Sequence, residues 1–316
     1  MTLKCPKGNF PKEKRISQWK EQIKKYISNP YLVDLLALFG YKHKGEDLEE
    51  QLKNLSDFVN ANWDFRKMSG SGERWTIEDR NQFVLENEPK IIEAADQLGM
   101  IHHKENLGEF DYIISLGGAR AATYERIEEA FAVWENQGKE GSVIALVGMR
   151  PLGEIEVPYV ESFMEEVEAG TTTEYDVACS AMEKLFSVKD GIITGENKEA
   201  NPNSRWQWRT YQGAKLAVLC APSSCPEKRR ANSRDTFVYF LNKYSVPSGS
   251  RILFVTSSIY INYQLSAFID LAVEYGFEIV FCGAGEPGRR NPVVSNYLQE
   301  IKGSIDAICN SLERLS

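Results

Sequence analysis

The chain has 316 residues and a net charge of −8, which argues against general nucleic-acid binding because a phosphate backbone requires a basic face. Its 42% hydrophobic and 26% charged residues are typical of a soluble globular protein. No apolar run approaches the roughly 20 residues that cross a bilayer, and the N-terminus lacks the apolar core of a signal peptide. We therefore expect a cytoplasmic protein without a membrane segment.

Residues 1–104 are expected to form a helical N-terminal region, because apolar side chains recur there at helical spacing. Three stretches carry the pattern: Ile16, Trp19, Ile23 and Ile27; Tyr31 to Phe39; and Leu48, Leu52, Leu55 and Val59. We expect these side chains to form a core, with a binding role for the region as the alternative.

From about residue 105, apolar runs alternate with helical patterns. The predicted strands are 111–116, 142–147, 215–220, 251–256 and 278–282, and the predicted helices are about 120–137, 173–187, 233–244, 261–275 and 293–313. This alternation predicts parallel crossovers, and hence a doubly wound, mostly parallel Rossmann-like sheet over residues 105–316. The interval at about 150–213 is predicted to be an elaborated insertion in that α/β domain.

Small, hydroxylic and cationic residues follow the predicted strands. They are Gly117, Gly118 and Arg120; Gly148 and Arg150; and Thr256, Ser257 and Ser258. Ligands of open parallel sheets bind beyond the carboxyl ends of the strands, so these residues are candidate ligand contacts. Turn chemistry alone also favours Gly and Ser after strands.

Two arginines are candidates for an anion clamp. Arg120 falls in the first turn of a predicted helix, where a cation opposes the helix dipole and a bound anion would account for it. Arg150 projects from the second strand end, and guanidinium groups match planar oxyanions. The alternatives are pairing of Arg120 with Glu125 or Glu128, and a salt bridge from Arg150 to the acidic stretch 154–168, which is otherwise expected to be a solvated face.

The stretch Arg205-Trp-Gln-Trp-Arg209 has two interpretations. Alternating tryptophans and arginines would suit a lid that stacks on a base or a sugar ring. An ordinary two-faced strand with one tryptophan packed inside would show the same pattern, and we favour it. The histidines and cysteines show no ligand spacing, so no metal site is predicted.

Several segments, taken in order, resemble the YdcF/SanA-like family of Rossmann-like α/β domains. The matching positions are the turn Leu116-Gly117-Gly118, Arg126 on the helix that follows, Val147-Gly148-Met149, Glu174, Ser233-Arg234-Asp235-Thr236 and Val255-Thr256-Ser257. The chain departs from the family pattern where Tyr260 and Tyr263 stand at the positions of a histidine and an arginine. The resemblance covers roughly the last two thirds of the chain.

This resemblance implies a pocket at the strand ends. It implies ligand contacts from Arg126, Ser233, Thr236 and Tyr260, and it makes Glu174 and Asp235 the candidate catalytic carboxylates. Each group at a helix start has a structural alternative, because carboxylates and hydroxyls commonly cap helices.

The first functional hypothesis is a small-molecule-binding α/β protein that acts on a nucleotide-like or phosphorylated, anionic ligand. Were it an enzyme, a transferase or hydrolase would fit; whether it is one stays open. S-adenosylmethionine is an alternative ligand, whereas NAD and FAD are disfavoured because the Gly-x-Gly-x-x-Gly fingerprint is absent. The rival hypothesis is a non-catalytic metabolite sensor or adaptor.

Overall fold

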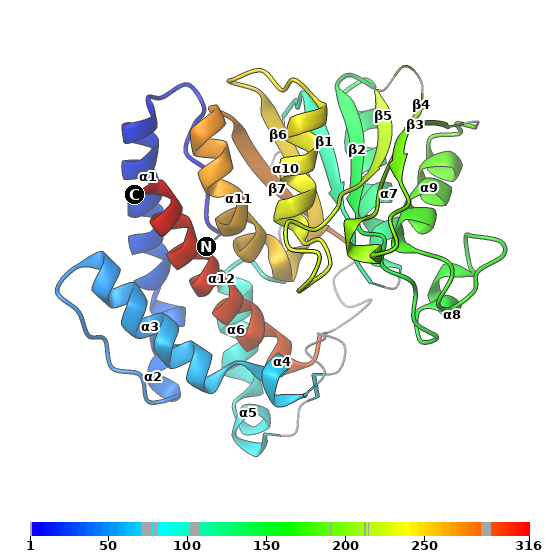
Figure 1. Ribbon diagram of the computed structural model, residues 1–316. Helices are drawn as coiled ribbons and strands as arrows, with labels where there is room; N and C mark the ends of the chain where they lie inside the picture. Colours follow the sequence, from blue (N-terminus) through cyan, green and yellow to red (C-terminus); the bar gives the residue numbers. More distant parts are fainter. Residues whose placement is uncertain are drawn as a thin grey trace. The chain divides into compact units, whose positions relative to one another are not determined.

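The computed structural model describes residues 2–70, 77–78, 81–101, 108–119, 121–189, 191–211, 213, 215–285 and 292–316 (Figure 1). The chain divides into two compact units. The helical unit comprises Met1–Lys104, Ser258–Gly276 and Glu286–Ser316, and the α/β unit comprises Glu105–Ser257 and Phe277–Gly285. The predicted domain boundary at about residue 104 stays a prediction.

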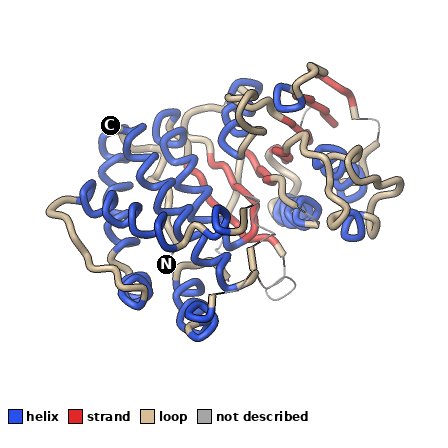
Figure 2. The backbone as a smooth tube through the Cα atoms, turned by 60° about the horizontal axis from the view of Figure 1, so that its bottom comes forward, coloured by secondary structure: helices blue, strands red, loops and turns tan. Residues whose placement is uncertain are grey.

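The described residues of the helical unit form helices and loops (Figure 2). The elements are α1 (Lys12–Ile27), α2 (Pro30–Leu38), α3 (Leu48–Asn62), α4 (Phe65–Met68), α5 (Gln82–Glu86), α6 (Glu88–Gln97), the 3₁₀ turn η4 (Ser258–Tyr260), α11 (Ile261–Tyr275) and α12 (Val294–Leu315). The prediction of a helical N-terminal region is confirmed. Its apolar stripes are buried, and the indole of Trp19 donates to Ser311 Oγ of α12 at 3.0 Å.

Buried polar contacts also hold the helical unit together. The guanidinium of Arg15, which is 1% exposed, donates to the carbonyls of Ala272 and Val273 at 2.8 and 3.1 Å. These carbonyls lie in the last turn of α11, whose partial negative charge favours a cation. No described helix of the chain is long and apolar enough to span a bilayer.

The described residues of the α/β unit form a seven-stranded mixed sheet. Its strands are β1 (Tyr112–Leu116), β2 (Ser142–Val147), β3 (Ile192–Asn197), β4 (Trp206–Tyr211), β5 (Leu216–Cys220), β6 (Arg251–Ser257) and β7 (Glu278–Ala284), in the order β3-β4-β5-β2-β1-β6-β7. The strands from β5 to β7 pair in parallel, and β3 and β4 add an antiparallel edge. The predicted fold class is therefore confirmed.

Helices cover both faces of this sheet, as its apolar strands require. The helices are α7 (Ala122–Asn136), α9 (Glu174–Leu185) and α10 (Ser233–Lys243), while the short helix α8 (Val157–Val160) packs against Val177 of α9. One face packs Ile113, Val143 and Val218 against α7 and α9. The opposite face packs Tyr112 and Phe254 against Phe240 and Phe237 of α10, respectively.

The strand order reverses between β1 and β6. From β1 the chain adds β2 and β5 on one side of the sheet, and then returns to add β6 and β7 on the other. Such a reversal is the point where doubly wound sheets leave a crevice beyond their strand ends. The candidate residues that follow β1 and β6 lie at this reversal.

All five predicted parallel strands are present, within a residue or two of their expected bounds. The structure adds β3, which sequence analysis did not predict, and shows that the stretch at 205–209 lies mostly in β4. It corrects one detail of the two-faced strand: Trp206 and Trp208, two residues apart, lie on the same face, beside Tyr239 and Tyr244 of α10.

Candidate functional site

The glycine turn after β1 is shaped by side chains that pack against it. A Cβ on Gly117 would lie 2.2 Å from Glu174 Oε1 and 3.2 Å from the Cα of Val147. A Cβ on Gly118 would lie 3.0 Å from the guanidinium of Arg126. Both glycines are therefore required by close approach of other groups, since neither has a positive φ.

Glu174 is held at the carboxyl ends of β1 and β2. It is the first residue of α9, whose N-terminus is fixed by a capping box between Thr173 and Asp176. Its own amide donates to the carbonyl of Arg150 at 2.9 Å, which ties the helix start to the chain leaving β2. A Cβ on Gly148 would stand 3.6 Å from Glu174 Oε2. The carboxylate thus lies between the turns that follow two adjacent strands.

The Glu174 carboxylate is buried, with 11% of the side chain exposed. Within the described part of the chain it accepts no hydrogen bond, and its single ion contact is with Arg150 Nε at 3.8 Å. Burying a carboxylate with so few partners is unfavourable. A carboxyl group in this environment is a candidate for contact with a ligand.

Burial raises the pKa of Glu174, because it penalises the ionised form. The positive charges of Arg150, Arg126 and Arg230 oppose that effect, and the negative charge of Glu156 adds to it. The net pKa is above the ordinary value for a glutamate. A raised pKa favours the protonated carboxyl group, which can donate a proton as well as accept one, as general acid–base chemistry requires.

Arg150 is engaged mainly with the protein itself. Its Nη1 and Nη2 donate to the two oxygens of Glu156 at 2.6 and 2.9 Å. Glu156 also accepts from the amide of Gly153 at 2.9 Å, and its side chain is 4% exposed. The structure thus shows the salt bridge to the acidic stretch that was the alternative for Arg150. A clamp formed by Arg150 would have to share its charge with two carboxylates.

Arg126 also points into the protein. Its Nη1 donates to the carbonyls of Leu116, at 3.0 Å, and Gly117, and its Nη2 donates to Ser257 Oγ at 3.1 Å. Because these acceptors lie at the ends of β1 and β6, Arg126 joins the strands on either side of the sheet reversal. Arg126 therefore positions the glycine turn. Its positive charge also acts to lower the pKa of Glu174.

The remaining strand-end candidates differ in accessibility. Thr256 is completely buried, and its hydroxyl has no hydrogen-bond partner among the described residues. Ser257 is half-buried and accepts the bond from Arg126. Ser258 and Tyr260 lie in η4, which belongs to the helical unit. Arg120 lies outside the described residues.

The carboxylate of Asp235 stabilises the start of α10. It accepts from the amide of Asn232, completing a capping box, and it forms an ion pair with Arg229. Burial acts to raise the pKa of Asp235, but the hydrogen bonds from Arg229, the Asn232 amide and Ser224 outweigh it together with the charge of Arg229, so the net pKa is lowered. Thr236 donates to the carbonyl of Ser233 at 2.8 Å. These contacts account for the side chains of Asp235 and Thr236 without a ligand, whereas Ser233 takes part through its backbone carbonyl.

The structure also brings in residues that sequence analysis missed. Glu156 was placed in a solvated acidic face, yet it is nearly buried beside Arg150. Thr123 fixes the glycine turn: its hydroxyl donates to the carbonyl of Gly118 at 2.8 Å and accepts from the amide of the same residue at 3.0 Å. The short separation of Glu156 and Arg150 along the chain could have indicated their ion pair. No feature of the sequence indicated the role of Thr123.

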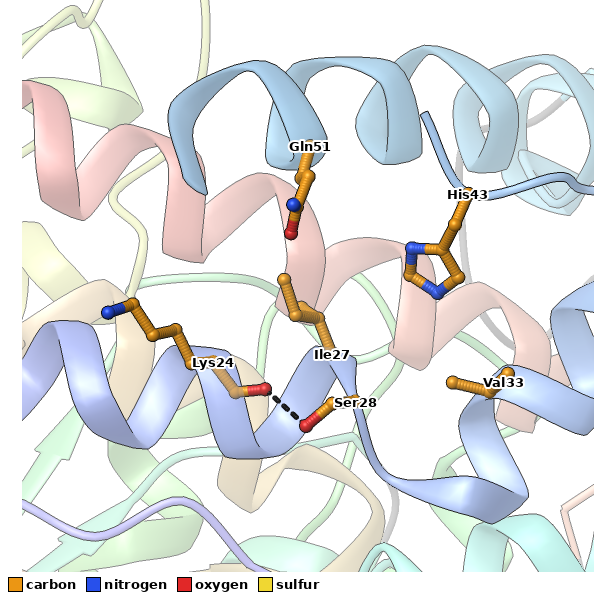
Figure 3. Close-up of a pocket in the computed structure, with 6 residues that line it drawn as sticks. All are labelled: Lys24, Ile27, Ser28, Val33, His43 and Gln51. Carbon is orange, nitrogen blue, oxygen red and sulfur yellow. Dashed lines mark hydrogen bonds between the residues drawn. The ribbon is translucent and has the colours of Figure 1, made fainter. Parts of the chain in front are cut away.

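A separate cavity of about 410 Å³ lies in the helical unit. Its lining residues are Lys24, Ile27, Ser28, Val33, His43 and Gln51 (Figure 3). The ammonium of Lys24 extends away from the other side chains, and Ser28 donates to the Lys24 carbonyl at 2.7 Å.

The described residues contain no group of three or more His, Cys, Asp or Glu that could hold a metal ion.

Fold and site together define a class: a doubly wound α/β unit with a buried carboxyl group at its strand ends, in a chain with a helical N-terminal region. Residues 11–99 match the family model described as the Rv3785 N-terminal domain. Over 98% of its length the chain is 24% identical to the uncharacterized protein Rv3785 of Mycobacterium tuberculosis and to the uncharacterized protein Mb3814 of Mycobacterium bovis, covering 94% of each. No solved structure matches.

These matches correct the family assignment made from short motifs. The resemblance to the YdcF/SanA-like family is wrong, and the similarity extends instead to Rv3785 over nearly the whole chain, N-terminal helices included. Glycine and hydroxyl residues recur after the strands of many parallel sheets, which is why the motifs matched in order.

Proposed function

We propose that the α/β unit binds a small hydroxyl-bearing metabolite of the nucleotide or sugar-phosphate class beyond the carboxyl ends of β1 and β2. The observation that carries this proposal is the Glu174 carboxyl group, which is buried against Gly117, has a raised pKa and accepts no hydrogen bond from the described residues. Ligand hydroxyls would supply the missing donors. The protein would be cytoplasmic.

The charges around Glu174 favour a ligand with both hydroxyl and anionic groups. Arg150 and Arg230 act on Glu174 electrostatically, and Arg150 is only 12% exposed. Ligand hydroxyls would contact the carboxyl group, and an anionic group would be attracted to the nearby cations. If the protein is an enzyme, Glu174 is suited to exchange a proton with a substrate hydroxyl, as a transferase or hydrolase requires.

Two observations favour a second candidate, a non-catalytic metabolite sensor. Arg126 is bonded to strand-end carbonyls and Arg150 to Glu156, so neither guanidinium is directed at a ligand. S-adenosylmethionine also remains a candidate ligand, since its ribose hydroxyls would suit Glu174 without an anion clamp.

A thermal-shift screen with nucleotides, sugar phosphates and S-adenosylmethionine tests the proposal. A ligand that binds the folded state raises the melting temperature of the wild type. Glu174→Gln, which keeps the shape of the side chain, should reduce the shift because it weakens binding of the ligand. Glu128→Gln removes the same charge from an exposed position of α7 and should leave the shift unchanged. Turnover of the bound compound distinguishes the enzyme from the sensor, and no shift with any compound would contradict the proposal.

A further inference from the structure

A cluster of three aromatic rings on the α10 face of the sheet lies close to a lysine ammonium group. Trp206 and Trp208 extend from β4, and Tyr239 extends from α10. The Nζ atom of Lys243 lies 5.0, 6.0 and 5.1 Å from the ring centroids of Trp206, Trp208 and Tyr239. All three distances are within the range of cation–π attraction. We refer to these three rings as the aromatic cage.

The residues of the aromatic cage lie on two regular elements, β4 and α10. Residues two apart on a strand share a face, so both tryptophans of β4 point to the α10 side. Tyr239 and Lys243 are four residues apart on α10, so they share a face of the helix. Tyr244 stacks against Phe240, and its ring centroid lies 5.7 Å from that of Trp208, so the indole also packs against α10. The rings are thus held in place by the fold rather than by the lysine.

The four side chains are more exposed than those of a hydrophobic core, as a binding site requires. Trp206, Trp208 and Tyr239 are each half-buried, and Lys243 is exposed. The ammonium can therefore leave the rings for solvent at low cost, while the rings cannot leave the sheet. A half-exposed set of rings that already selects an ammonium group is complementary to cations in general.

We propose that the aromatic cage is a binding site for a quaternary or methylated ammonium group, and that Lys243 occupies it in the absence of the ligand. A methylated ammonium keeps its positive charge but is more weakly hydrated than the primary ammonium of lysine, so it exchanges water for aromatic faces more readily. The ligand displaces Lys243, whose side chain then extends into solvent. This site does not include Glu174. It gives a binding role to Trp206 and Trp208, which have no role in the proposed function.

Two sources of such a group exist: a choline-like metabolite and a trimethyl-lysine side chain of another protein. Both share the charge and the methyl groups that the cage recognises. They differ in what surrounds the ammonium group, so their affinities distinguish them.

The test is a tryptophan-fluorescence titration of the full chain with tetramethylammonium, at constant ionic strength. Lys243→Ala removes the tethered competitor, so tetramethylammonium should bind this variant on the order of tenfold more tightly than the wild type. Lys139→Ala is the matched control, because Lys139 lies 5.8 Å from one tryptophan ring, that of Trp134, outside the cage. It should bind like the wild type. Trp206→Leu, added to Lys243→Ala, should abolish saturable binding.

The neutral isostere tert-butanol separates cation recognition from hydrophobic contact. Equal binding of tert-butanol and tetramethylammonium to Lys243→Ala would overturn the proposal, as would identical titrations of the Lys243 and Lys139 variants. Far-UV circular dichroism confirms that each variant is folded. Tighter binding of choline than of a trimethyl-lysine peptide supports the site with a metabolite as ligand, and the reverse order supports it with a methylated protein. Binding of neither overturns it.

Discussion

Replacing Arg126 with leucine should destabilise the α/β unit strongly. The side chain is 3% exposed and donates to two carbonyls at the end of β1 and to Ser257 at the end of β6. A hydrogen bond from a charged group contributes about 1.5–3 kcal/mol, and acceptors that lose it stay buried. We expect a loss of about 3–5 kcal/mol in the free energy of unfolding. That is a large fraction of the roughly 5–15 kcal/mol of a typical protein.

Urea denaturation of the full chain measures this loss, through the midpoint and slope of the transition. Ser257→Ala removes one of the three acceptors and should cost about 1 kcal/mol. Arg126→Lys should fall between the two, since an ammonium group keeps the charge but lacks the planar fork. A cost below about 1 kcal/mol for Arg126→Leu, combined with loss of ligand binding, would refute the structural role and make Arg126 a ligand contact.

Three further predictions concern Gly117, Glu174 and Arg15. Gly117→Ala should displace Glu174 and lower the free energy of unfolding by about 1–3 kcal/mol through overpacking, whereas Gly148→Ala, whose Cβ meets ordinary contacts, should change it by less than about 0.5 kcal/mol in the same urea experiment. Because the pKa of Glu174 is raised in the folded state, its contribution to stability is present below the unfolded pKa and is lost as the pH rises through the folded pKa. Glu174→Gln should therefore be more stable than the wild type at pH 8 and equally stable near pH 4. Thermal melting at the two pH values measures this difference. Arg15→Met should lower the stability of the chain by about 2–4 kcal/mol, since two buried carbonyls of α11 lose a charged donor, and a loss under about 0.5 kcal/mol would contradict this role.

The parallel strands could be predicted from the sequence because they are buried on both faces. Each appears as a short continuous apolar run, such as Ser142–Val147. The edge strand β3 has no such run: it mixes exposed Ile192 and Ile193 with Gly195 and Glu196, and it pairs with only one neighbour. An edge strand is half-solvated, so its pattern resembles that of a loop.

The sequence selected residues at the strand ends as a candidate site, and that site stays a prediction; the side-chain contacts of these residues could not be predicted. The rule that ligands bind at strand ends selected the glycine turns, and the structure shows that Gly117 and Gly148 lie beside Glu174. The direction of an arginine side chain cannot be predicted from its residue type, so Arg126 and Arg150 were expected to face a ligand. In the structure Arg126 donates to strand-end carbonyls, and Arg150 pairs with the carboxylates of Glu156 and Glu174.

The family assignment shows the same limitation. Short motifs in the correct order reflect the turn chemistry that parallel sheets share, and so they predicted the fold class correctly and the family wrongly. The N-terminal helices, which those motifs ignore, include the segment that matches the Rv3785 N-terminal domain. Whole-chain similarity is the more specific signal because it includes the helices as well as the turns.

The central claim is that the buried carboxyl group of Glu174 contacts the hydroxyls of a small-molecule ligand. The most direct measurement is the affinity of a ligand from the thermal-shift screen for the wild type, Glu174→Gln and Glu128→Gln at neutral pH. Our account predicts that Glu174→Gln weakens binding on the order of tenfold or more while Glu128→Gln binds like the wild type, because a charged acceptor of ligand hydroxyls is worth about 1.5–3 kcal/mol. Equal affinities of all three proteins for the ligand would contradict it.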